Sequence, residues 1–139
     1  MSENARYWIW FQNALGYGAK IKSIIGEYKS AKLLYELGES EWKMSTVLSK
    51  RQVEKLMMTN LGEADEIVNC CSKNGYKIID FDDEAYPKRL KEIINPPAVL
   101  YVDGELPDID NLVCIGMVGT RKASEYAIKA AHIMAKGIT

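Results

Sequence analysis

Apolar and polar residues alternate with a helical period through the first half of the chain. Ile21, Ile24 and Tyr28 lie three or four positions apart, as on one face of a helix. Similar spacing recurs at intervals up to residue 74. Four glycines interrupt it where helices are expected to end: Gly26, Gly38, Gly62 and Gly75. The pattern predicts four or five short helices over residues 1–75, packed as a small all-α bundle.

The pattern changes after residue 75. Residues 76–79 and 98–102 each have the composition of a short strand, and Pro87 opens a short basic helix between them. Residues 112–118 form an almost unbroken apolar run, which is typical of a strand buried on both faces. Strands that alternate with helices predict an α/β arrangement for residues 76–139.

A glycine-led turn follows the apolar run and leads into another helix. Ser124 stands at an N-cap position, because Tyr126 and later apolar residues follow at helical spacing. Four acidic residues, Asp80, Asp82, Asp83 and Glu84, precede Tyr86 and Pro87, where we expect a solvated turn. His132 lies among apolar residues of the last helix without a nucleophile nearby, so we interpret it as structural.

The turn between residues 118 and 125 has the chemistry of an anion site. The first amides of a helix have no partner within it and carry partial positive charge. A planar guanidinium and two hydroxyls add donors that suit a phosphate. The candidate phosphate-binding residues are Gly119, Thr120, Arg121, Lys122 and Ser124. An ordinary strand-to-helix turn with its arginine in water is the alternative.

The composition sets limits on function. The chain has 139 residues, 47% hydrophobic and 27% charged, with a net charge of −1. These values are those of a globular protein, so nucleic-acid binding would depend on a local patch. Three cysteines and one histidine have no metal-ligand spacing, and no stretch is long and apolar enough for a membrane span. We therefore predict no metal, no cofactor, no catalytic residues and a cytoplasmic location with reduced thiols.

Three ordered motifs give the chain a resemblance to a known family. They are Tyr86-Pro87-x-x-Leu90, then Asn95-Pro96-Pro97-Ala98-Val99-Leu100-Tyr101-Val102-x-Gly104, then Gly119-Thr120-Arg121 with Ser124 and Tyr126. Together they resemble the DNA-processing protein A family (DprA, also called Smf). The resemblance implies a Rossmann-like domain that binds single-stranded DNA and hands it to the RecA recombinase during natural transformation. That family is not known as an enzyme. Ala127 departs from its usual glycine.

The resemblance also predicts the domain organisation. Residues 1–75 would form a SAM-like helical domain with a degenerate helix-hairpin-helix, and residues 76–139 the first part of the Rossmann-like domain. Lys20 follows the hairpin sequence of residues 15–19 and is a further candidate for DNA contact. The alternative is a tight helix-helix turn that needs glycine for positive φ. Because the family's later strands lie beyond Thr139, we expect this N-terminal fragment to self-associate through residues 112–118 or to have a poorly ordered C-terminal part.

Two other functions stay open. The same strand, turn and helix are found in nucleotide-binding Rossmann-like enzymes of the lysine-decarboxylase-like phosphoribohydrolase type, which need a carboxylate close to the sugar. Alternatively, the helical half is a protein-interaction module with no ligand of its own.

Overall fold

The computed structural model describes residues 4–17 and 19–138. Five helices come first: α1 (Ala5–Leu15), α2 (Ile21–Tyr28), α3 (Ala31–Met44), α4 (Lys50–Met58) and α5 (Leu61–Asn74). They are followed by β1 (Lys77–Asp80), α6 (Lys88–Glu92), β2 (Val99–Val102) and α7 (Glu125–Ile138). The prediction of a helical first half, and of short strands near residues 76–79 and 98–102, is confirmed.

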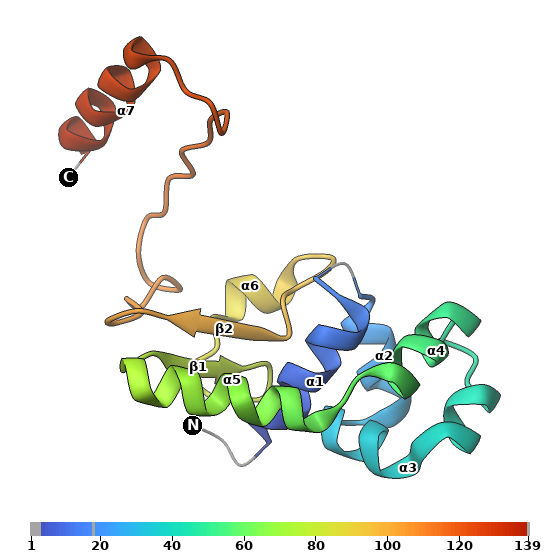
Figure 1. The fold of residues 1–139 in the computed structure, drawn as a ribbon. Coiled ribbons are helices and arrows are strands. Elements are labelled where there is room, and N and C mark those ends of the chain that lie inside the picture. Colours follow the sequence, from blue (N-terminus) through green and yellow to red (C-terminus); the bar gives the residue numbers. More distant parts are fainter. Residues whose placement is uncertain (1–3, 18, 139) are drawn as a thin grey trace.

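Helix α1 is the centre of the core. It contacts α3, α4, α5 and both strands, and Figure 1 shows helices α2–α5 and the two strands arranged around it. Trp8, Ile9, Trp10 and Phe11 are all buried, so successive residues of α1 bury their side chains in different directions. A helix that is apolar all round belongs in a protein interior, where each turn packs on a different neighbour.

Local sequence sets most helix ends. Ser49 and Gln52 form a reciprocal capping box at the start of α4, and Gly75 ends α5 in the left-handed conformation at φ 73°. Gly38, at φ 76°, kinks α3. The predictions for Gly26 and Gly62 are wrong, since both lie inside helices.

The two strands form an antiparallel pair that packs against the helices. The register runs from Lys77 opposite Val102 to Asp80 opposite Val99. Gln12 of α1 is buried, and its side-chain oxygen accepts the Val99 amide hydrogen at 3.0 Å. This bond satisfies the Val99 amide, which β1 does not pair. Ile78 and Val99 also share one hydrophobic core with the helices. Helices α1–α5 and the strand pair are therefore packed as one body.

The acidic residues at the end of β1 and in the turn after it are only partly solvated. Asp80 is fully buried, and its carboxylate accepts the Asp82 amide hydrogen at 3.0 Å. Asp82 in turn accepts the indole hydrogen of Trp8 at 3.0 Å. The expectation of a solvated turn is wrong for Asp80, because this turn is held against α1.

The predicted buried strand at residues 112–118 is also wrong. The structure has no regular element there, and Val113 and Val118 are 94% and 97% exposed. A strand needs a neighbour to satisfy its backbone groups, and no strand of the described residues lies beside this stretch. The helix predicted after Ser124 is confirmed as α7, which stands apart from the body in Figure 1 with no buried residue. The structure is thus mostly helical with a small two-stranded sheet, which is compatible with a truncated α/β part, while the Rossmann-like and SAM-like assignments stay predictions.

Candidate anion site at the start of helix α7

Ser124 caps helix α7. Its hydroxyl oxygen accepts the Ala127 amide hydrogen at 3.3 Å, and its carbonyl accepts the Ile128 amide hydrogen at 3.0 Å. The predicted N-cap is confirmed, because serine in this position replaces the missing helical acceptor. The amides of Glu125 and Tyr126 have no hydrogen-bond partner among the described residues. These two donors lie at the positive end of the helix dipole, where an anion is stabilised.

The turn before Ser124 supplies cations. Arg121 and Lys122 are exposed, and neither forms an ion pair within residues 4–17 and 19–138. The Lys122 amide hydrogen points to the Thr120 hydroxyl at 3.4 Å, a weak bond that leaves the hydroxyl hydrogen for a ligand. Open space surrounds Gly119, so an anion can approach its backbone. These five residues form a continuous, solvent-facing donor set, and only Glu125 adds a carboxylate close to them in sequence.

The structure does not bring Lys20 to this donor set. Lys20 precedes α2 on the body, whereas α7 lies apart (Figure 1). The turn before Lys20 contains Gly16 at φ 76°, which favours the tight-turn interpretation of the hairpin. Gly18, part of the same predicted hairpin, is outside the described residues.

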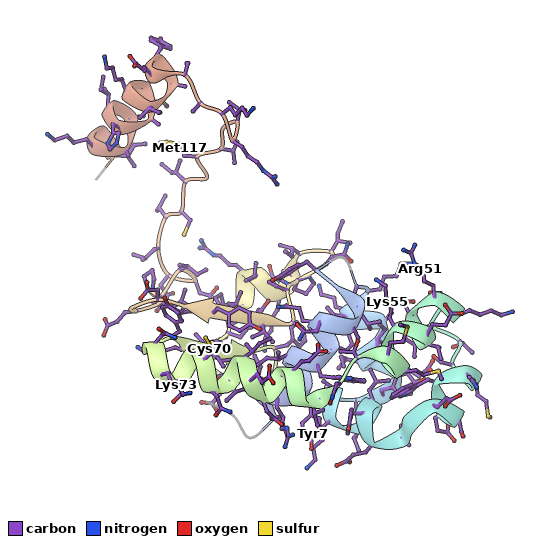
Figure 2. All side chains as sticks on the ribbon, viewed as in Figure 1. Tyr7, Arg51, Lys55, Cys70, Lys73 and Met117 are labelled. Carbon is purple, nitrogen blue, oxygen red and sulfur yellow. The ribbon has the colours of Figure 1, made fainter. Side chains whose placement is uncertain are left out.

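A tether that sequence reasoning missed fixes the segment leading to the site. The Asp110 carboxylate accepts the amide hydrogens of Arg89 at 3.0 Å and Lys88 at 2.8 Å, and these bonds lower its pKa. The Arg89 guanidinium donates to the Leu112 carbonyl at 3.0 Å. A helix that starts after proline needs an acceptor for its first amides. Pro87 could therefore have indicated that another part of the chain supplies this acceptor. The tether ends at Leu112, and Figure 2 shows Met117 on the extended connection beyond it.

The tyrosine of the first motif, Tyr86, has a structural role. The Tyr86 hydroxyl donates to the Pro97 carbonyl at 2.7 Å, and burial raises the pKa of Tyr86 to about 12. Its ring packs on Phe81, with the Lys91 ammonium 5.4 Å from its centre. Two of the three sequence motifs therefore contact each other, and they shape the body rather than the anion site.

The remaining chemistry is sparse. No group of three metal-ligating side chains occurs within the described part of the chain. Cys70, Cys71 and Cys114 are free thiols, and burial raises the pKa of Cys71. None of the helices described is long and apolar enough to cross a bilayer. His132 and Tyr126 are exposed on α7.

Comparisons with known proteins support the resemblance to the DNA-processing protein A family. The family described as "DNA recombination-mediator protein A" matches residues 77–139. A protein of Bacillus subtilis (strain 168), named "DNA processing protein DprA", is 33% identical over 66 residues. The match spans 48% of this chain and 22% of that protein. No solved structure matches the chain. The matched region contains the Tyr86 and Pro97 contact and all five residues of the candidate anion site, and this part of the chain is similar to the DNA recombination-mediator protein A family.

Proposed function

We propose that this protein binds single-stranded DNA and acts as a cytoplasmic recombination mediator that hands DNA to RecA during natural transformation. The match of residues 77–139 to the family and the name of the Bacillus subtilis relative support a role in DNA processing. The observation that carries the DNA-binding step is the unpaired, exposed Arg121 beside the free amides at the start of α7.

The donor set suits a phosphodiester. The Arg121 guanidinium presents parallel N–H groups that match two phosphate oxygens, and Lys122 adds a second charge. The Ser124 hydroxyl is engaged as a cap acceptor, so its part is to hold the first turn of α7 open to the ligand. Thr120 adds a hydroxyl donor. These contacts recognise the backbone rather than the bases, which fits binding without sequence preference.

A binding role accounts for this site better than catalysis. The phosphoribohydrolase alternative requires a carboxylate held close to the sugar of a nucleotide. Around Arg121, no carboxylate is fixed by a hydrogen bond or ion pair within the described residues. Titration with AMP and with a short oligonucleotide, with an assay for released base, separates the two functions.

The Arg121→Ala variant is expected to bind a single-stranded oligonucleotide about ten- to a hundredfold more weakly, because a charge-assisted hydrogen bond is worth about 1.5–3 kcal/mol. Removal of one phosphate contact also reduces the log-log salt slope by about 0.7. Fluorescence anisotropy over a range of salt concentrations measures both quantities.

Lys129→Ala is the matched control. Lys129 is an exposed cation of α7 that lies beyond its first turn. The Lys129→Ala substitution should lower the affinity for DNA only slightly, since the Lys129 ammonium is remote from the unpaired amides. If Arg121→Ala bound as tightly as the wild type at every salt concentration, the anion site would be wrong.

The exposed apolar stretch 112–118 supports a further part of the proposal, namely self-association. Val113 and Val118 are nearly fully solvated, and an apolar chain with unpaired backbone groups can pair with an identical one. Sedimentation velocity is expected to show concentration-dependent association, which the Val113→Lys and Val118→Lys double variant reduces. Ile94→Lys, at an 87% exposed site on the body, is the control. Wild-type protein that stays monomeric over the same concentrations would contradict this proposal.

A further inference from the structure

Three tyrosines of the body are exposed far from the anion site. Tyr17 follows α1, Tyr76 precedes β1, and Tyr101 lies in β2; their side chains are 69%, 42% and 41% exposed. The proposed DNA contact at α7 uses none of them. Phenol rings are amphipathic, so a group of them on one side of a protein indicates a surface that meets another molecule.

The sheet register places two of these rings together. Tyr101 is paired with Ile78, and Tyr76 is two residues before Ile78. Tyr76 directly precedes Lys77, the first residue of β1, and Lys77 is paired with Val102, the residue after Tyr101, so Tyr76 adjoins the end of β2 at which Tyr101 lies.

The third ring, Tyr17, follows α1, which contacts β2 and bonds to Val99 of that strand through Gln12. Burial raises the pKa of Tyr101 to about 12, and the charge of Tyr17 contributes to that rise, as expected when the two hydroxyls are near each other. Three chain segments thus bring one phenol each to the same side of the body.

Cations flank these rings. Lys20 is exposed three residues after Tyr17, and Lys73 is exposed three residues before Tyr76. Figure 2 shows Lys73 at the C-terminal end of α5, the end from which the chain enters β1. Neither lysine forms an ion pair in the described part of the chain. Rings with cations beside them suit single-stranded nucleic acid, whose bases stack and whose phosphates carry negative charge.

We propose that Tyr17, Tyr76 and Tyr101 form a base-stacking surface for single-stranded DNA, a second contact besides the phosphate-binding site at α7. The inference rests on the proposed function, because the ligand is the same. Here it is the bases that are bound rather than the backbone alone. The surface gives the helical part of the chain a direct role in binding DNA.

The test compares leucine with phenylalanine at the tyrosines. Tyr17→Leu combined with Tyr101→Leu removes two rings, and Tyr17→Phe combined with Tyr101→Phe keeps them. With an oligothymidylate probe, the leucine variant is expected to bind at least about fivefold more weakly, and the phenylalanine variant as well as wild type. An abasic probe of equal length, with the same phosphates, should bind all three proteins alike. Circular dichroism verifies that each variant is folded.

The outcomes separate this inference from the proposed function. If the leucine variant binds oligothymidylate normally while Arg121→Ala does not, the stacking surface is refuted and the anion site stands. Equal losses on the abasic and oligothymidylate probes would also refute stacking. If wild-type protein binds neither probe, both proposals fail. Because Tyr17 is largely exposed, Tyr17→Leu alone serves as a second variant should the double variant fail to fold.

Discussion

Replacement of Trp8 by alanine is expected to lower the free energy of unfolding by about 3–5 kcal/mol. Trp8 is fully buried, with ring centres 5.7 Å from Phe11 and 5.5 Å from Phe81. It joins α1 to the turn after β1, so its removal leaves a cavity between the helices and the strand pair. The expected loss is a large share of the roughly 5–15 kcal/mol that stabilises a typical domain. Urea unfolding followed by circular dichroism measures it.

Trp8→Phe separates the ring from its N–H group. Burial raises the pKa of Asp82, and the indole hydrogen bond partly opposes this rise by favouring the ionised carboxylate. An acid with a raised pKa in the folded state loses stability as pH rises through that pKa. Without the indole donor the pKa of Asp82 rises further, so Trp8→Phe should cost more stability at neutral than at mildly acidic pH. A cost independent of pH would show that the bond to Asp82 contributes nothing.

The packing around Trp8 bears on the proposed domain boundary at residue 75. The division into residues 1–75 and 76–139 follows the change from helical to strand-like pattern. In the structure, however, two side chains of α1 bond to the second part. The Trp8 indole donates a hydrogen bond to Asp82 in the turn after β1, and the Gln12 side chain accepts one from the Val99 amide of β2. If the division describes separate folding units, the Trp8→Ala variant should unfold in two steps. A single transition would place the strand pair with the helices.

Features that depend on neighbouring residues could be predicted from the sequence. The helices of the first half follow from their apolar spacing, and the cap of α7 follows from Ser124 lying before a helical pattern. Features that depend on remote partners could not. The bond from Trp8 to Asp82 joins residues 74 positions apart, and the acceptor of the first amides of α6 is Asp110, more than twenty residues away.

Residues 112–118 were predicted wrongly for the same reason, because a buried strand also depends on remote partners. Their composition is that of a buried strand, but composition does not provide the neighbouring strands that would bury them. The anion site depends less on such partners. Its charges and unpaired amides are neighbours in the chain, so the sequence alone could propose the donor set, while the closeness of Tyr76 to Tyr101 needed the register of the sheet.

Replacement of Trp10 by alanine should also cost about 3–5 kcal/mol, on the opposite side of α1. Trp10 is fully buried against Tyr35 and Trp42, with ring centres 5.0 Å and 5.8 Å away. Its indole nitrogen donates to the Thr59 carbonyl at 3.0 Å, which ties α1 to the end of α4. The cavity would therefore separate α1 from α3 and α4. The strand pair makes none of these contacts.

Hydrogen exchange shows how far this loss spreads. If α1 unites the body, Trp10→Ala should increase exchange in β1 and β2 as much as in α3 and α4, because all of them then open only by global unfolding. Trp10→Phe is the control, since it keeps most of the packing and lacks the bond to Thr59. Protection that fell in α3 and α4 while the strands stayed protected would show two independent units. The helical part would then be free to move relative to the strand pair, and the tyrosines at positions 17 and 101 would have no fixed spacing for stacking bases.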